Sequence, residues 1–267
     1  MKTFSEQLQD LKAAGYRLAE AEAKVAHDAV LFAMHKSGFK DKATVKGGVV
    51  MCELTTEVRR TTMDLDLDFV HCSISEASIR RIVARWARLT GFRITIFGTV
   101  QELRQEDYRG KRIYLDISDG TVKRPVRTKV DIGVHTHKEI LQVERQFQAL
   151  VDENAFLLSN SKEQIFAEKL LSLIRHGIVS TRTKDVFDMY YLSQSLNKRD
   201  LKDCLNHLIV KNRKCPLRGA DEILAALART FASKRFLRDM ASRKSNWLGL
   251  PPLSVTEGLM AFLRGVL

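Results

Sequence analysis

Three aspartates alternate with apolar residues in the stretch DLDLDF at residues 64–69. In a β-strand this alternation places Asp64, Asp66 and Asp68 on one face and the apolar side chains on the other. Carboxylates this close repel one another at neutral pH unless a cation lies among them. Carboxylate oxygens that converge from two strands, such as this one and the later stretch KVDIGVH with Asp131, are ligands that Mg²⁺ prefers. The pattern therefore predicts a divalent-cation site.

Two glycines, Gly47 and Gly48, follow Lys46 shortly before the acidic stretch. Because glycine has no Cβ, the backbone can approach a triphosphate closely, and N–H groups at a helix start can donate to its phosphates. Two metal ions about 4 Å apart clamp both the attacking and the leaving oxygen of a phosphoryl displacement. Together these features predict nucleotidyl transfer from a nucleoside triphosphate. The alternative is a solvated edge strand whose aspartates are only surface charge.

The N-terminal half of the chain mixes helical and strand patterns. Helical periodicity runs from residue 4 to about 36, and a short helix is expected after the glycines. A further helix follows the acidic strand in SISEASIRRIVARWARL, with Ser73 or Ser75 as its cap. Three strands are expected in GFRITIFGTV, KRIYLDIS and RPVRTKVDIGVH, and the turn SDGT joins the last two.

After residue 138 the pattern becomes helical, beginning with EILQVERQFQAL and continuing through SKEQIFAEKLLSLIRHG to the C-terminus. The sequence therefore predicts an α+β fold with two domains. An α/β domain with a mixed sheet would span residues 1–137, and an all-helical domain would span residues 138–267.

The chain of 267 residues has a formal net charge of +12, which favours an anionic partner such as nucleic acid. On the helix after the acidic strand, Arg81, Arg85 and Arg88 share one face, and residues 229–244 are also basic. No apolar run is long enough for a membrane span, and the four cysteines form no C-x-x-C pair. We therefore expect a reduced, cytoplasmic protein with no membrane contact.

The motifs resemble those of a known family. Lys46-Gly47-Gly48 followed by Arg60-x-Thr62-x-Asp64-x-Asp66 is similar to the first motif of the AbiEii/AbiGii nucleotidyltransferase toxins, within the polymerase-β-like superfamily. Downstream, AEKLLSLIRHGIVSTRTKDVFDMYYL resembles the helical motif of that family, with a lysine on one helix and two aspartates on the next. The resemblance covers about residues 40–195 and implies a nucleotidyltransferase-like fold.

The resemblance also implies roles for individual residues. Asp64 and Asp66 would bind Mg²⁺ or Mn²⁺, and Asp131 would be a third ligand or the base for the attacking hydroxyl. The nucleotide would lie against the residues Lys46, Gly47, Gly48, Thr62, Lys169 and Asp188. Lys169 would reach a phosphate, and Asp185 or Asp188 would orient that lysine.

Two questions of residue assignment stay open in the sequence. The metal pair is Asp64 with Asp66 or, one step along, Asp66 with Asp68. His135 and His137 follow Asp131 in the same strand, but a zinc site would need further ligands, and no Cys or His is spaced to supply them.

The resemblance implies a toxin of a type IV toxin–antitoxin or abortive-infection system. Such a toxin would transfer a nucleotide from an NTP to RNA, at the 3′ end of tRNA, and a cognate antitoxin protein would restrain it. Two alternatives remain: nucleotidylation of a protein or small-molecule acceptor, and a non-catalytic module that binds RNA or a partner on the same scaffold.

Overall fold

A computed structural model describes residues 1–104, 109–134, 140–148, 154–215, 217 and 219–267. The chain divides into two compact units, described separately below. Unit 1 comprises Met1–His137 and Gln142–Asn160, and unit 2 comprises Lys138–Leu141 and Ser161–Leu267. The predicted boundary between residues 137 and 138 falls in the segment 135–139, outside the described residues, as do His135 and His137.

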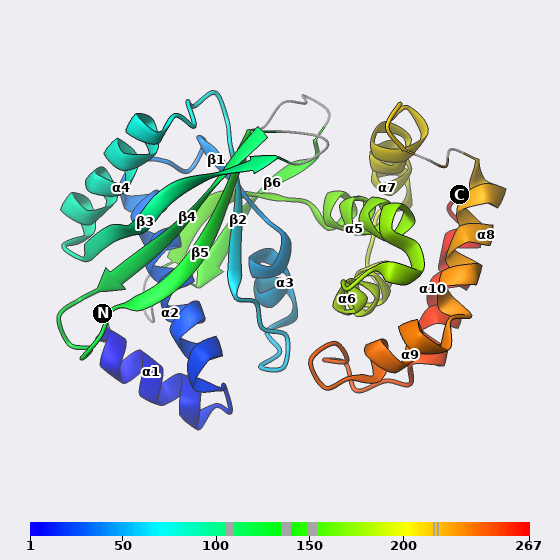
Figure 1. Ribbon diagram of the computed structural model, residues 1–267, viewed down its shortest axis with the longest axis horizontal. Helices are drawn as coiled ribbons and strands as arrows, with labels where there is room; N and C mark the ends of the chain where they lie inside the picture. The colour runs from blue at the N-terminus through cyan, green and yellow to red at the C-terminus, as the bar shows by residue number, and fades with distance from the viewer. Residues whose placement is uncertain (105–108, 135–139, 149–153, 216, 218) are drawn as a thin grey trace. The chain divides into compact units, whose positions relative to one another are not determined.

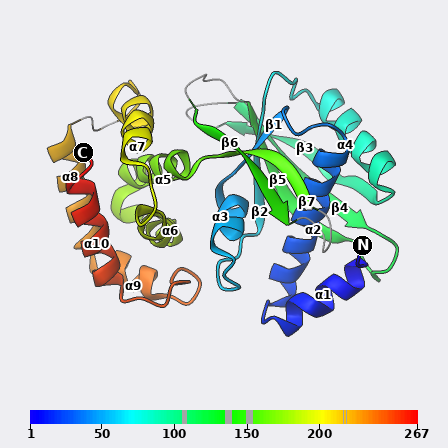
Figure 2. The same ribbon diagram turned by 180° about the vertical axis from the view of Figure 1, so that it is seen from behind.

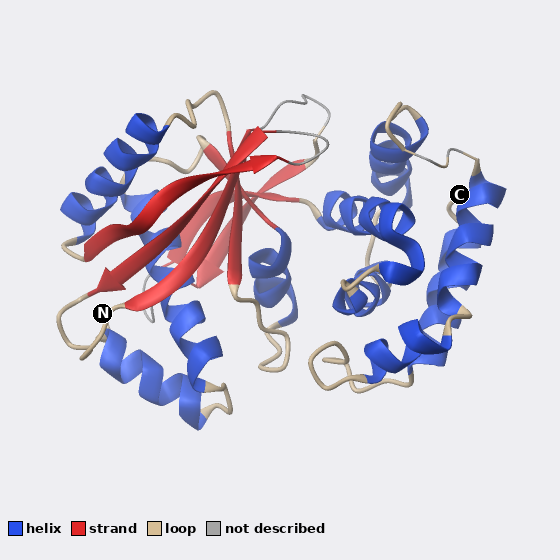
Figure 3. Ribbon diagram, in the orientation of Figure 1, coloured by secondary structure: helices blue, strands red, loops and turns tan. Residues whose placement is uncertain are grey.

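Unit 1 is built on a seven-stranded mixed sheet with the strand order β3-β4-β5-β2-β1-β7-β6 (Figures 1 and 3). Strand β2 lies at the centre, parallel to β5 and antiparallel to β1, and β1 is parallel to β7. A mixed α/β fold is therefore confirmed. The strands are β1 (Ala43–Lys46), β2 (Asp64–Phe69), β3 (Arg93–Arg104), β4 (Arg109–Ser118), β5 (Val126–Val134), β6 (Gln142–Gln148) and β7 (Asn154–Asn160).

The helices of unit 1 are α1 (Phe4–Ala13), α2 (Leu18–Lys36), α3 (Gly47–Thr55) and α4 (Glu76–Thr90). Helix α2 crosses one face of the sheet and contacts β5, β7 and α4 (Figure 2). The helical periodicity from residue 4 to about 36 corresponds to two helices, α1 and α2, because the chain breaks at Gly15, whose φ of +98° favours glycine. The predicted cap of α4 is confirmed, because the Ser75 side chain accepts a hydrogen bond from the Ser78 backbone N–H.

An apolar core lies between the sheet and the helices. The β2 residues Leu65, Leu67 and Phe69 are buried. The Phe69 ring packs edge-on against Phe39 with centroids 5.2 Å apart, and Phe39 packs in the same way against Trp86 of α4 at 6.1 Å. Burying each such side chain stabilises the fold by roughly 1.5–3 kcal/mol. The buried apolar residues of DLDLDF thus hold β2 against the core, and the aspartates that alternate with them project from the opposite face of the strand.

The helix predicted over EILQVERQFQAL is wrong, and so is the all-helical half from residue 138. Gln142–Gln148 forms strand β6, which pairs antiparallel with β7 at the edge of the sheet. Of this strand only Phe147 is buried. An edge strand that buries one residue lacks the repeated alternation by which strands are recognised in a sequence.

Unit 2 consists of helices in its described residues. They are α5 (Lys162–His176), α6 (Thr183–Ser193), α7 (Lys198–Leu205), α8 (Ala220–Phe231), α9 (Lys234–Ala241) and α10 (Pro252–Arg264), with short 3₁₀ and π segments at Gly177–Val179 and Asn206–Val210. Helix α5 packs against α6, α7 and α8, and α10 packs against α6 and α8. Throughout the described part of the chain, each helix is too short or too polar to cross a bilayer.

A buried histidine on α2 makes the stability of unit 1 depend on pH. Burial, together with the charge of Lys24, lowers the pKa of His27 from 6.5 to about 3. Lys24 itself is ion-paired with Asp28 at 2.9 Å. The folded state therefore keeps His27 neutral at pH values where the unfolded chain binds a proton, so its contribution to stability is complete above pH 6.5 and is lost as the pH falls toward 3.

We therefore expect wild type to lose stability relative to a His27→Leu variant by up to about 1.4 kcal/mol per pH unit below pH 6.5. Urea unfolding of both proteins between pH 8 and pH 4.5 measures this difference directly. The comparison cancels other titrating groups, including Asp28 and Glu53, whose pKa values are raised by burial and act in the opposite direction. Parallel profiles for the two proteins would contradict the expectation.

Candidate active site

The acidic residues of β2 and β5 lie side by side in the sheet. The two strands are parallel, and Asp66 is in register with Asp131, Asp64 with Lys129, and Asp68 with Gly133. Because side chains alternate along each strand, residues in these paired positions project from the same face. The prediction that the aspartates share one face is confirmed, and Asp131 lies beside the central one.

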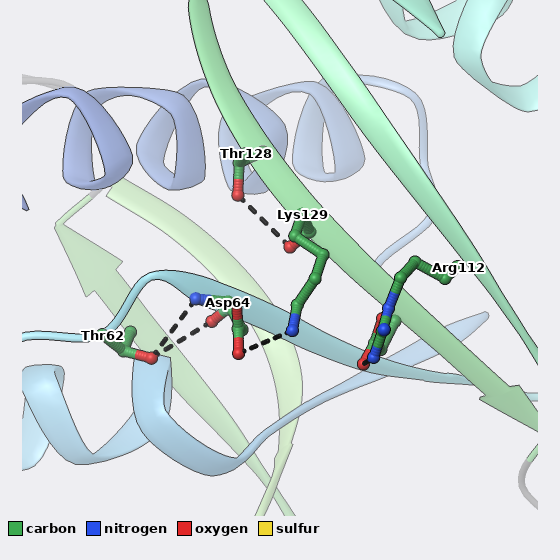
Figure 4. A network of polar contacts seen from close by, with 6 residues as sticks. Thr62, Asp64, Arg112, Thr128 and Lys129 are labelled. Atoms are coloured by element: carbon green, nitrogen blue, oxygen red, sulfur yellow. Dashed lines mark hydrogen bonds and ion pairs between the residues drawn. The ribbon is translucent and has the colours of Figure 1, made fainter. Parts of the chain in front are cut away.

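Two of these carboxylates form ion pairs with basic residues on neighbouring strands. Arg112 of β4 donates two hydrogen bonds to Asp131, from Nε at 2.7 Å and from an Nη atom at 2.8 Å. These bonds raise the pKa of Arg112, so the guanidinium stays charged. Lys129 Nζ lies 2.9 Å from Asp64 Oδ2, a contact visible in Figure 4. The basic residues thus neutralise the carboxylates that were predicted to require a cation.

Asp68 differs from the other two acids of the strand. Its carboxylate pairs with Lys46 Nζ at 2.8 Å, and its side chain is only 9% exposed, compared with 45% for Asp64. A nearly buried, paired carboxylate is less open to an incoming ion than an exposed one. This contact also directs the Lys46 ammonium toward Asp68, whereas the family resemblance assigned Lys46 to the nucleotide.

The two glycines begin helix α3 directly beside Asp66. Gly47 has φ +60°, and a Cβ built there would lie 2.8 Å from Asp66 Oδ2. A Cβ on Gly48 would lie 2.8 Å from the Cβ of Thr62, whose hydroxyl is 3.3 Å from the carbonyl oxygen of Asp64. Both positions therefore require glycine. The first N–H groups of an α-helix have no partner within it, and here they lie next to an acid, where they can donate hydrogen bonds to an anion such as a phosphate.

A Gly47→Ala variant should lose about 1–2 kcal/mol of stability through its left-handed backbone and should also lose nucleotidyl transfer, because the new methyl group displaces the Asp66 carboxylate. The matched control is Gly91→Ala, at φ +74° with nothing within 4 Å of the new Cβ. That variant should show a similar loss in thermal unfolding but normal activity. Equal activities of the two variants would contradict the steric role of Gly47.

In the described residues, no three His, Cys, Asp or Glu side chains are gathered so that they could hold a metal ion. The ion pairs give the physical reason, because Arg112 occupies both oxygens of Asp131 and Lys129 occupies Asp64. The donor set nevertheless suits a hard divalent cation, since three carboxylates project from adjacent positions on one face.

A second cluster lies within unit 2 and contains the remaining predicted residues. Lys169 of α5 forms ion pairs with Asp185 and, at 3.0 Å, with Asp188, both on α6. The side chain of Asp188 is 0% exposed and accepts a second hydrogen bond from Trp247 Nε1 at 3.0 Å. The two aspartates thus hold the lysine, as the resemblance implied. The rings of Tyr191 and Trp247 pack beside the cluster, with centroids 5.6 Å apart.

Two residues of the site, Arg112 and Lys129, were not identified from the sequence. Lys129 precedes Asp131 by two residues in a predicted strand, so the alternation could have placed it on the same face. Arg112 lies opposite Asp131 only because β4 and β5 pair in one particular register. No local pattern in the sequence specifies that register.

Comparison with known proteins gives one family and distant structural relatives. The family model described as "Nucleotidyl transferase AbiEii toxin, Type IV TA system" matches residues 29–250. No curated protein matches the sequence. The crystal structure of JHP933 from Helicobacter pylori is similar with a TM-score of 0.44 and 16% identity, over 90% of this chain and 95% of that one.

An antigenic nucleotidyltransferase-like protein from Paracoccidioides brasiliensis is similar with a TM-score of 0.41 and 14% identity, over 84% of this chain and 93% of that one. The family match covers most of the chain and includes the acidic strand, the glycines and the lysine–aspartate cluster. This chain belongs to the AbiEii nucleotidyltransferase toxin family of type IV toxin–antitoxin systems.

Proposed function

We propose that this nucleotidyltransferase moves a nucleotidyl group from an NTP to RNA, at the 3′ end of tRNA, and that it does so with a divalent cation. The observation that carries the proposal is the position of Asp66, which lies in register with Asp131 and against the side-chain-free start of α3. Carboxylates that would bind a cation and a helix end that would bind phosphate thus lie next to one another, which supports transfer from a triphosphate.

Asp64 and Asp66 would hold Mg²⁺ or Mn²⁺, with Asp131 as a third ligand or as the base. Both Asp64 and Asp68 are ion-paired, but the side chain of Asp64 is 45% exposed and that of Asp68 only 9%, which favours this assignment over Asp66 with Asp68. When bound, the ion would neutralise negative charge on the α-phosphate and on the departing pyrophosphate. It would replace the ammonium of Lys129 as the partner of Asp64.

The chain's own groups would then act on the nucleotide and on the acceptor. The first N–H groups of α3, at Gly47 and Gly48, donate to the triphosphate oxygens, with Thr62 beside them. The 3′ oxygen of the acceptor attacks the α-phosphorus, pyrophosphate leaves, and the hydroxyl proton passes to Asp131 or to solvent. Within unit 2, Asp185 and Asp188 hold the ammonium of Lys169, which the family resemblance assigns to a phosphate.

The test is incubation of the protein with each α-labelled NTP, Mg²⁺ or Mn²⁺, and total tRNA, with the products resolved as RNA and as protein. We expect label to enter tRNA with one or more of the NTPs and to be lost with EDTA. Periodate oxidation destroys the 3′ hydroxyl, so oxidised tRNA should accept no label. Label on a protein band, or undiminished labelling of oxidised tRNA, would overturn the proposed acceptor.

The family also leads us to propose a cognate antitoxin protein as a partner. Co-expression with such a protein should relieve the growth arrest that this chain causes in a bacterial host.

A further inference from the structure

Unit 1 contains a pocket apart from the acidic cluster, formed by α4 together with residues that precede β1 and follow β2. Its volume is about 320 Å³, within the usual range of about 300–1,000 Å³ for small-ligand sites. Three basic residues line it, Lys42, Arg81 and Arg85, and of the described residues that line it none is acidic. The pocket is therefore electropositive, and an anion would be attracted into it.

The wall of this pocket includes a buried hydrogen-bond donor that the protein leaves unsatisfied. Trp86 is 1% exposed, and its indole Nε1 finds no acceptor among the described residues. Its ring is held edge-on against Phe39, which also lines the pocket. The Nε1 atom itself has almost no accessible surface, so Trp86 contributes the apolar part of its ring to the pocket wall.

The two sides of α4 differ in how their charges are compensated. Arg80 pairs with Glu76 at 2.7 Å, one turn away on the same helix. Arg81, by contrast, donates to the hydroxyl of Ser78 at 3.2 Å, and that serine also lines the pocket. The guanidinium of Arg81 is thus positioned by a neutral group and keeps its full charge for a ligand.

We propose that this pocket binds a phosphate group of the RNA backbone, with Lys42, Arg81 and Arg85 supplying the charge. The inference rests on the proposed RNA acceptor and adds a specific contact for it. A phosphodiester presents charged oxygens that arginine and lysine bind well, and backbone contacts of this kind position an RNA without reading its sequence.

The experiment measures binding of fluorescently labelled tRNA by anisotropy at several salt concentrations, without NTP. The variant is Arg85→Gln, and the matched control is Arg80→Gln, which removes the same charge from the same helix outside the pocket. We expect Arg85→Gln to weaken binding about tenfold and Arg80→Gln to weaken it less than twofold. The slope of log affinity against log salt should fall by about 0.7–0.9 for Arg85→Gln, as for the loss of one phosphate contact.

Thermal unfolding of the two arginine variants checks that each one keeps its fold. Equal weakening by Arg85→Gln and Arg80→Gln would contradict phosphate binding in the pocket, because tRNA binding would then depend only on the overall positive charge of the protein. Binding of labelled polyglutamate with the same dependence on Arg85 would assign the pocket to an acidic protein instead. If inorganic phosphate at low millimolar concentration and constant ionic strength displaced tRNA from wild type but not from Arg85→Gln, that result would assign the pocket to a free anion.

The outcomes for the pocket and for catalysis are separable. An Asp66→Asn variant should bind tRNA like wild type, because Asp66 is not among the pocket residues. If tRNA binding depends on Arg85 but no label is transferred, the pocket stands and the proposed reaction fails. If label is transferred but Arg85→Gln and Arg80→Gln behave alike, the reaction stands and the pocket fails.

Discussion

An Asp66→Asn variant should lose nucleotidyl transfer by at least about 10³-fold, equivalent to about 4 kcal/mol of transition-state stabilisation. Asparagine keeps the shape of the side chain next to Gly47 but removes the charge that would bind a cation. Folding should be preserved, since the change also relieves repulsion from Asp131, its partner in the sheet. Single-turnover labelling of tRNA gives the rate, and urea unfolding gives the stability.

The matched control is Asp68→Asn, on the same face of the same strand. Because Asp68 is nearly buried against Lys46, its neutralisation should cost about 1–3 kcal/mol of stability and leave the transfer rate within about tenfold of wild type. Loss of transfer in Asp68→Asn with unchanged stability would move the metal pair to Asp66 and Asp68. Wild-type transfer by Asp66→Asn would remove the catalytic role of the strand altogether.

A Lys169→Met variant should destabilise unit 2 by about 3–5 kcal/mol, because it leaves the carboxylates of Asp185 and Asp188 without their shared cation. Asp188 has no exposed side-chain surface, so water cannot replace the ammonium there. Urea unfolding followed by tryptophan fluorescence in a Trp86→Phe background reports on this region, because Trp247 then remains as the fluorophore and it contacts Asp188.

Lys162→Met is the control for this second prediction. Lys162 lies on the same helix, and its Nζ donates to the Ser195 hydroxyl at 3.1 Å in an exposed position. Its replacement should cost less than about 0.5 kcal/mol. A Lys169→Met/Asp188→Asn double variant should recover part of the stability lost by Lys169→Met, because one buried charge is removed. If Lys169→Met and Lys162→Met were equally stable, the lysine would not be neutralising a buried charge.

The parts of the site that depend on short stretches of sequence were predicted. In DLDLDF the alternation fixes which residues face the core, because Leu65 and Leu67 are buried and the aspartates take the other face. The glycine pair likewise predicted the helix start of α3, since its backbone geometry is local. Lys169 with the two aspartates of α6 followed from the family resemblance.

The parts that depend on strand pairing were not predicted. Val143 and Phe147 are spaced four apart, as on one face of a helix, so the edge strand β6 does not show the alternation of a strand in the sequence. Its conformation comes from hydrogen bonding to β7, a contact between segments that no window of residues contains. Arg112 was not identified for the same reason, because its contact with Asp131 depends on the register in which β4 pairs with β5.

The parallel strand pairs have a consequence for when the protein can become toxic. Asp66 meets Asp131 only after β3 and β4 have been made, and the flanking pair of β1 with β7 joins Thr44 to Leu158. Contacts between such distant positions form slowly, because the long loop between them must close, at a cost in chain entropy, before the contacts can stabilise the fold. A ribosome-bound chain that has emerged only as far as β4 therefore has no assembled acid cluster. The first turnover therefore cannot take place until β5 has left the ribosome and paired with β2.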